Sequence, residues 1–385
     1  MLIKNQVEDC ITPVQMNLIL NSRVFWRELA VWTRVYFRSR YFGIGDADEA
    51  FMHLYDTPYK FISTLQLIFG SEFSRGYTLL LNQHIITLRE LISAHIDGNV
   101  AAINQNIDLL YQNSHERASY LSASNPFWSE TEWRNLFDTY IQLTLEEANS
   151  VAMDDQRQSI QIYDRISSHS DRIGDYFSQG LFDYIVYNPQ INNPQNQRYR
   201  NDIPCITNTQ MNTIYNMRMF WFELTAWIRA LFVVIFEDIG AQENVLSRMN
   251  TVIYNYQKTL STFLGEQPTE EYINLVITYI ELFIALFNAQ KEGNTEAIDQ
   301  YTKSIYQNIS QQAAFLASVN PYFEQNLWSN MLTNFTRYTL DSATSYLAGD
   351  ISTSLDNFDR LLDLSLELGD VFAYSLFLLN HNEVL

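Results

Sequence analysis

The chain contains few of the residues that form turns or cross-links. Its 385 residues include 12 glycines, 8 prolines and 2 cysteines. So little glycine and proline disfavours a turn-rich all-β protein and is typical of long helices. Two cysteines are too few for a disulfide framework. Neither Cys10 nor Cys205 has a basic neighbour in sequence that would activate its thiol, so we expect both to be packed small side chains.

Lysine is scarce as well. Only five of the 24 basic residues are lysine, and 44 acidic residues bring the net charge to −20, with a pI of about 4.6. A surface this acidic repels phosphate backbones and anionic lipids, which excludes nucleic acid and membrane surfaces as favoured partners. Arginine, tyrosine and asparagine are common in protein contacts. The composition therefore favours protein–protein contact, although the base composition of an AT-rich genome would produce the same bias.

Long uninterrupted apolar runs are missing. The N-terminus, MLIKNQVEDC, lacks the pattern of a signal peptide. The most apolar stretch, residues 272–289, is interrupted by Asn274, Thr278 and Glu281, whereas a spanning helix needs about 20 mostly apolar residues. We therefore expect a cytoplasmic protein without a membrane span.

The sequence is one unit written twice. The 25 residues from Cys10, CITPVQMNLILNSRVFWRELAVWTR, recur from Cys205 as CITNTQMNTIYNMRMFWFELTAWIR. The offset of 195 residues then holds almost to the end without insertion or deletion. A period this long indicates a duplicated domain rather than a solenoid. We predict one copy at 10–186, an Asn/Gln/Pro-rich linker at 187–204 and a second copy at 205–385.

Each copy has the apolar periodicity of helices. Apolar residues at helical spacing cover 16–36, about 48–69, 73–96, 99–123, 130–152 and 155–185. Asp46 and Asp48 could cap the second of these helices, Gly70 separates the second from the third, and Ser129 with Glu132 resembles a capping box. Helices this long with short loops pack as up-and-down bundles. The predicted fold is all-α, with two tandem bundles of about six helices each.

No motif identifies a catalytic site. The chain has no glycine-rich phosphate loop, no HExxH, no CxxC and no Glu-x-x-His. No histidine is kept in both copies, so an acid–base or metal site shared by both copies cannot depend on histidine. The tryptophans, at helical spacing, are expected in the core. Asn113 and Asn308 are expected to contact the backbone of a neighbouring helix.

Several charged residues recur on apolar helix faces. We interpret them as buried or half-buried ion pairs that fix helix register. The alternative is a carboxylate metal site of the di-iron type, for which Glu28 and His84 are the only weak candidates. The predicted structural pairs are drawn from Glu28, Arg34, Asp164 and Arg165 in the first copy and from Glu223, Arg229, Asp359 and Arg360 in the second.

The motifs resemble a known group of proteins. FWRELAVWTR, the DGN turn, YQNSHERASYLSASNPFW and IQIYDRISSHSDRIGDYFSQGLFDYI follow, in this order, a pattern similar to that of uncharacterised tandem helical-bundle proteins of spore-forming Firmicutes. The pattern is also similar to ferritin-like proteins of unknown function that have been described as spore coat proteins. The resemblance implies a ferritin-like bundle. Some members carry a label of acetylglutamate kinase, but no phosphate-binding loop supports it here.

The resemblance also implies three histidine positions, from which this chain departs. They hold Leu29, His84 and Tyr140 in the first copy and Leu224, Tyr279 and Phe335 in the second. Only one of six positions keeps a histidine, which favours a scaffold over a metal site.

These observations predict a non-enzymatic, self-associating structural protein, a spore-associated or crystalline inclusion component that forms homo-oligomers and has no cofactor or small-molecule substrate. Two alternatives stay open. One is a ferritin-like metal-binding protein that uses Glu28 and His84. The other is an α-helical pore-forming or insecticidal protein.

Overall fold

The computed structural model describes residues 11–187, 206–240 and 242–381, and the chain divides into two compact units, Met1–Asn208 and Thr209–Leu385. Within the described ranges the secondary structure is helical, apart from one antiparallel bridge between Ile11 and Ile206 in unit 1. The all-α fold class is therefore confirmed. The two cysteines lie outside the described residues, as does the predicted linker except for Tyr187, which is the last residue of a helix.

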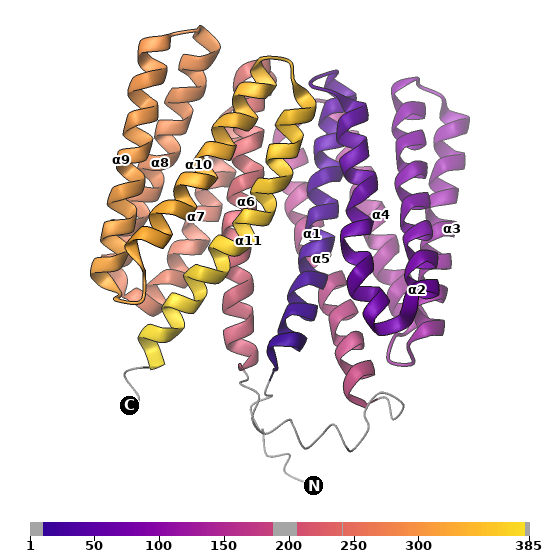
Figure 1. Ribbon diagram of the computed structural model, residues 1–385. Helices are drawn as coiled ribbons and strands as arrows, with labels where there is room; N and C mark the ends of the chain where they lie inside the picture. Colours follow the sequence, from indigo (N-terminus) through magenta and orange to yellow (C-terminus); the bar gives the residue numbers. More distant parts are fainter. Residues whose placement is uncertain (1–10, 188–205, 241, 382–385) are drawn as a thin grey trace. The chain divides into compact units, whose positions relative to one another are not determined.

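Unit 1 is a bundle of five helices, α1 to α5 (Figure 1). Its α1 packs against α2, α4 and α5, and each later helix packs against the next one along the chain. Gly70, with φ 85° and ψ 171°, breaks α2 into two helical segments, so the unit has six segments. The helices are α1 (Pro13–Phe42), α2 (Ala47–Ile96), α3 (Val100–Ser124), α4 (Glu130–Ala152) and α5 (Gln156–Tyr187).

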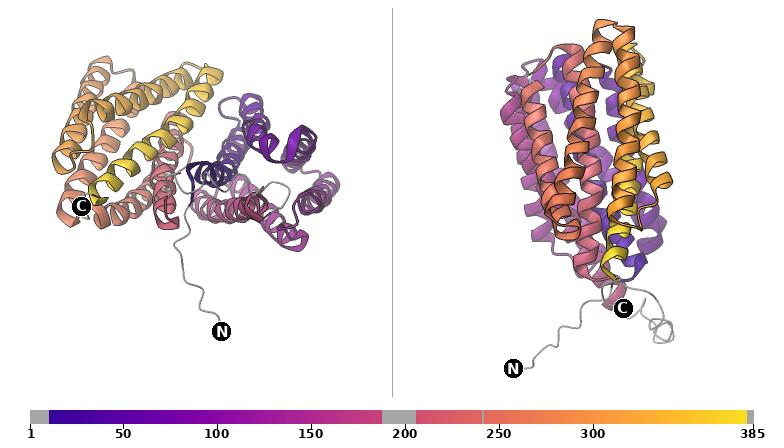
Figure 2. Two further views of the ribbon diagram at one scale, coloured as in Figure 1. Left: turned by 60° about the horizontal axis from the view of Figure 1, so that its bottom comes forward. Right: turned by 90° about the vertical axis from the view of Figure 1, so that its left-hand side faces the viewer.

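Unit 2 repeats this order of helices. Gly265 takes the same conformation as Gly70, with φ 81° and ψ 170°, and here it separates two assigned helices. Figure 2 shows that the long helices of each unit run side by side along a common direction. The bounds match those of unit 1 at an offset of 195 to within one residue for most helix ends: α6 (Asn208–Glu237), α7 (Gln242–Leu264), α8 (Glu266–Glu292), α9 (Thr295–Val319), α10 (Gln325–Leu347) and α11 (Ile351–His381).

The helix starts follow the local signals in the sequence. Thr12 caps α1 in a complete capping box with Gln15. Asp46 caps α2 and accepts bonds from two backbone N–H groups, whereas Asp48, also predicted as a cap, lies inside the helix. Ser129 caps α4 by accepting from the N–H of Glu132. The predicted capping box is not completed by Glu132, because the Ser129 N–H donates to Tyr176 Oη at 2.7 Å.

The core of each unit is aromatic. Trp26, Trp133, Trp221 and Trp328 are almost fully buried, as predicted. Trp133 stacks on Phe137 with ring centroids 5.0 Å apart. Such aromatic pairs add about 0.5–1.5 kcal/mol each to the burial of their area.

Two helices of unit 2 are long and apolar enough to cross a membrane by length and composition alone. They are α6, whose most apolar window is 78% buried, and α8, whose window is 50% buried. The core helix of a soluble protein gives the same pattern, so this observation is weak evidence for a span.

Candidate functional site: polar groups inside the two units

Glu28 and Arg34 lie on α1 and reach different neighbours. Six residues along an α-helix correspond to a rotation of about 240°, so the two side chains leave different faces. Glu28 Oε1 accepts from Lys60 Nζ on α2 at 2.6 Å. Arg34 donates to the buried carboxylate of Glu147 on α4 and to Ser159 Oγ on α5, the latter at 2.9 Å. These contacts tie α1 to α2, α4 and α5.

Unit 2 keeps the first tie with a different cation. Glu223 Oε2 accepts from Arg248 Nη2 at 2.8 Å, and Arg248 stands at the position of His53 rather than of Lys60. A glutamate therefore stands at both matching positions, and the cations that pair with it stand two helical turns apart in the matched numbering of the partner helix.

The second tie is lost in unit 2. In unit 2, Ser342 and Ser354 stand at the positions of Glu147 and Ser159, and Ser342 Oγ donates to Ser354 O at 2.8 Å. The guanidinium of Arg229 lies instead among the rings of Phe232, Tyr346 and Phe358, 5.2 to 5.9 Å from their centroids. Burial without a carboxylate lowers the pKa of Arg229 to about 10.

The predicted Asp–Arg pairs of the last helix do not lie in the core. Arg165 is exposed and donates to Glu146 Oε2 at 2.6 Å on the surface, and Arg360 is exposed as well. Asp164 and Asp359 are half-buried. The prediction that Arg165 and Arg360 are buried or half-buried is wrong, because each lies on the solvent side of its amphipathic helix.

A pair missed by the sequence reasoning joins α1 to α5 and α6 to α11. Arg23 binds Asp175, and Arg218 binds Asp370 through two bonds of 2.5 and 2.8 Å. The preceding glycine lets the helix backbones meet, because a Cβ at Gly174 would lie 2.6 Å from Arg23 Cα. Both members of each pair recur at the offset of 195, so the signal was present in the sequence.

A further buried polar group is Arg117 on α3, which is 1% exposed. Its Nε donates to Asn113 Oδ1 at 2.9 Å, and its guanidinium carbon lies 4.2 Å from the ring centroid of Phe137. Asn113 Nδ2 in turn donates to Leu80 O at 2.9 Å, which confirms the predicted contact with a neighbouring backbone. Arg117 Nη2 is buried and has no hydrogen-bond acceptor among the described residues.

Three more buried groups lie on the helices that Arg117 and Asn113 contact: Tyr77 and His84 are one turn from Leu80 on α2, and Tyr140 is one turn from Phe137 on α4. We call Tyr77, His84, Arg117 and Tyr140 the donor centre. His84 and Tyr140 have ring centroids 6.3 Å apart. Burial first, and the charge of Arg117 second, hold the pKa of His84 well below 6.5, so the imidazole is neutral at pH 7.

The metal candidates Glu28 and His84 have different surroundings. Glu28 is occupied by Lys60, and His84 faces a buried cation that repels metal ions. In the described part of the chain, no group of three or more His, Cys, Asp or Glu residues could hold a metal ion. The donor set in this region therefore suits an anion better than a metal cation.

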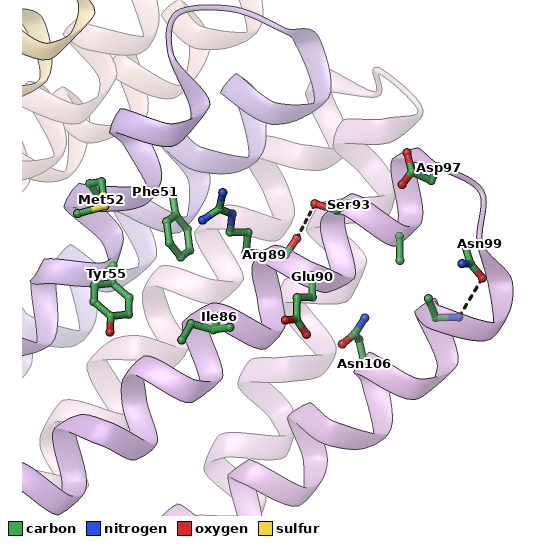
Figure 3. Close-up of a pocket in the computed structure, with 12 residues that line it drawn as sticks. Phe51, Met52, Tyr55, Ile86, Arg89, Glu90, Ser93, Asp97, Asn99 and Asn106 are labelled. Carbon is green, nitrogen blue, oxygen red and sulfur yellow. Dashed lines mark hydrogen bonds between the residues drawn. The ribbon is translucent and has the colours of Figure 1, made fainter.

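A surface groove of about 720 Å³ lies between the two segments of α2 and the start of α3 (Figure 3). The side chains of Phe51, Met52 and Tyr55 come from the first segment and that of Ile86 from the second. Arg89 lies over the Phe51 ring, 4.5 Å from its centroid. The groove is thus apolar on one side, and Glu90, Asp97, Asn99 and Asn106 make the other side polar.

Comparison of the chain with protein-family models, with curated proteins and with solved structures gives no match. The resemblance to the spore-forming Firmicute group therefore stays a prediction, and the case for function depends on the geometry of this chain.

Proposed function

We propose that this chain is a non-enzymatic structural protein that self-associates, in a spore-associated or inclusion-forming role. The observation that carries the proposal is the set of exposed apolar side chains on the two segments of α2. Met52 is 50% exposed, Leu67 89% and Leu79 63%, and the first of these lines the groove of Figure 3. Methionine and aromatic side chains on a surface of this kind are typical of protein contact sites.

The placement of charged residues supports a self-association that depends on pH and salt. Among the described residues six arginines are buried, compared with two acids, Glu28 and Glu147. Removing these cations from the surface leaves the exterior more acidic than the net charge of −20 suggests. Copies therefore repel one another at neutral pH and low salt. Acidification toward the pI of about 4.6, or added salt, weakens that repulsion.

Light scattering after size exclusion, with electron microscopy, tests the proposal between pH 5 and 10 at low and high salt. We expect assemblies to grow toward pH 5 and with salt. The double variant Met52→Glu and Leu67→Glu should prevent assembly without lowering the melting temperature, because both side chains are exposed. Thr262→Glu, at the unit 2 position that matches Leu67, is the control. A protein that stays monomeric under every condition contradicts the proposal.

A second candidate function, an α-helical pore-forming protein, is favoured by α6 and α8. Insertion would require unit 2 to open, because α6 is largely buried. Release of dye from neutral and anionic liposomes tests it. Release that persists with Ile280→Glu, which places a charge in the apolar window of α8, would argue against insertion of that helix.

A further inference from the structure

We propose that the donor centre of unit 1 binds one small monovalent inorganic anion, such as chloride, between α2, α3 and α4. The site is formed by Arg117 Nη2, His84 Nδ1, Tyr77 Oη and Tyr140 Oη. The proposal is independent of self-association, because all four atoms are internal to one unit.

The first step is the missing counter-charge of Arg117. Its side chain is 1% exposed, and no ion pair to it is present in the described ranges. The acid whose charge acts on it, Asp138, is used elsewhere, since its Oδ1 accepts from Ser114 Oγ and its Oδ2 lies 3.4 Å from His115 Nε2. A buried guanidinium without an anion is strongly unfavourable, because desolvation is not offset.

The second step is the set of unused polar atoms around that cation. His84 Nδ1, Tyr77 Oη and Tyr140 Oη are each buried without a hydrogen-bond partner among the described residues. The field of Arg117 reaches these groups, since its charge acts on the pKa of each. The Thr33 hydroxyl, which also acts on Tyr140, donates its own proton to Leu29 O at 2.8 Å.

The third step concerns the identity of the ligand. A guanidinium can only donate, phenols donate readily, and a neutral imidazole can present a proton on Nδ1. Buried water-sized ligands take two to four polar partners, which is the number available here. Water would satisfy these hydrogen bonds but leave the charge of Arg117 uncompensated. An anion satisfies both requirements, and a monovalent ion leaves the centre neutral.

Unit 2 provides an internal control because it has no cation at the position of Arg117, and its buried Arg229 lies on a different helix, at the position of Arg34. Gln312 replaces Arg117, and its Nε2 donates to Asn308 Oδ1 at 2.7 Å, as Arg117 Nε does to Asn113. Asn308 Nδ2 donates to Leu275 O at 3.1 Å, as Asn113 does to Leu80. Phe335 stands at the position of Tyr140 and has no hydroxyl. The proposal therefore predicts a bound anion at Arg117 and none at the matching position, Gln312.

Crystals of the full chain grown in sodium bromide provide the direct test. We expect one anomalous bromide peak within hydrogen-bonding distance of Arg117 Nη2. No such peak is expected at Gln312 or in Arg117→Gln, the variant that introduces the unit 2 residue. The control Arg134→Gln removes an exposed arginine from the same unit and should keep the peak. Ordered water without bromide at Arg117 overturns the proposal.

Thermal unfolding in solution gives a second measurement. Its deciding comparison uses the wild-type chain alone, so it does not depend on whether a variant folds. At equal ionic strength, chloride, bromide and nitrate should raise the unfolding midpoint of unit 1 relative to gluconate, which is too large to be buried. The expected rise is about 5–10 °C once the anion exceeds its Kd a hundredfold. Arg117→Gln should lose this dependence and Arg134→Gln should keep it. Equal midpoints for the wild-type chain in chloride and gluconate overturn the proposal.

Discussion

Arg34 and Glu147 form a buried ion pair in unit 1, with the carboxylate 1% exposed. The matching arginine of unit 2, Arg229, has Ser342 where the glutamate would be. The buried arginines at these matching positions thus have different partners: Arg34 pairs with a carboxylate, and Arg229 lies among aromatic rings. Because the helices around the two sites have matching bounds, the difference can be tested by exchange of single residues.

Glu147→Gln should destabilise unit 1 by about 3–5 kcal/mol, because it leaves a buried guanidinium without its counter-charge. The adjacent Glu146 makes a surface pair with Arg165, so Glu146→Gln is the matched control and should cost at most about 1 kcal/mol. Hydrogen exchange of peptides from α1 and α4, read separately from those of unit 2, gives the two values. Equal effects of the two variants would contradict the assignment of Glu147 as the counter-charge.

Ser342→Glu is the reverse exchange and should stabilise unit 2 by supplying Arg229 with a carboxylate. The ion pair must offset the loss of the Ser342–Ser354 bond and the burial of a longer side chain. The new carboxylate should also raise the pKa of Arg229 above its present value of about 10. Thermal unfolding compared with Ser342→Gln, which has the same length without the charge, measures the effect. A gain with glutamine as large as with glutamate would mean that charge is not the cause.

Acid should weaken unit 1 through His84. Its pKa is lowered in the folded chain, so the folded state binds fewer protons than the unfolded state. The stability that this provides is fully present above the unfolded pKa of 6.5 and is lost as pH falls below it. The loss approaches about 1.4 kcal/mol per pH unit. The pKa of His169 is lowered as well, mainly by burial, and acts with the same sign.

Urea unfolding between pH 7.5 and 5 measures this slope. His84→Gln should make the slope shallower by the contribution of one histidine. The raised pKa of Glu147 has the opposite sign, since its contribution is present at low pH and is lost as pH rises. It cancels when the variant is compared with the wild type at the same pH. A slope unchanged by His84→Gln would contradict the prediction.

The fold could be predicted because its signals are local. Apolar periodicity, the glycines at 70 and 265 and the caps at Asp46 and Ser129 act within one or two helical turns, and the structure confirms each of them. The extra helical residues at the start of α1, from Pro13, follow from a cap that the sequence also shows, Thr12 with Gln15. Those at its end, up to Phe42, follow from Gly43, whose left-handed backbone closes the helix.

The polar contacts could be predicted only in part because their partners are distant in sequence. Glu28 was correctly placed at a buried cross-helix contact, but nothing local specifies whether Lys60 or a residue at position 53 supplies the cation. No role could be predicted for Arg117 from the sequence. A buried arginine on an amphipathic helix has the same sequence pattern as an exposed one, and only the positions of the neighbouring helices show that it is buried.

Close backbone contact between α1 and α5 predicts that Gly174→Ala is costly. Its Cβ would meet the backbone of Arg23, which cannot move without displacing α1, and Gly369→Ala would meet Arg218 in the same way. We expect a loss of about 1–3 kcal/mol in the affected unit, as for other overpacked cores. Gly76→Ala is the control, since its Cβ meets only the far end of the Tyr120 side chain. Thermal unfolding of the three variants measures the difference, and a larger loss for Gly76→Ala would contradict it.

Asn125 both ends α3 and holds α5, and Asn320 does the same in unit 2. Asn125 Nδ2 donates to Gly180 O at 2.9 Å, and its Oδ1 accepts from Phe127 N at 3.0 Å. The side chain of Asn320 donates to Ser375 O at 2.9 Å. Both asparagines are fully buried, so truncation removes two hydrogen bonds and leaves a cavity at a buried site.

We expect Asn125→Ala and Asn320→Ala each to destabilise their own unit by about 1–3 kcal/mol. Faster hydrogen exchange should appear at the C-terminal half of α5 in the first variant and of α11 in the second. Asn99→Ala is the control, because Asn99 caps α3 from an exposed position and binds only the N–H of Ala102. It should raise exchange at the start of α3 and leave α5 protected, since the side-chain hydrogen bond of Asn99 is the local one to Ala102 N. Increased exchange of α5 in Asn99→Ala, or none in Asn125→Ala, would show that the buried asparagine does not hold the last helix in place.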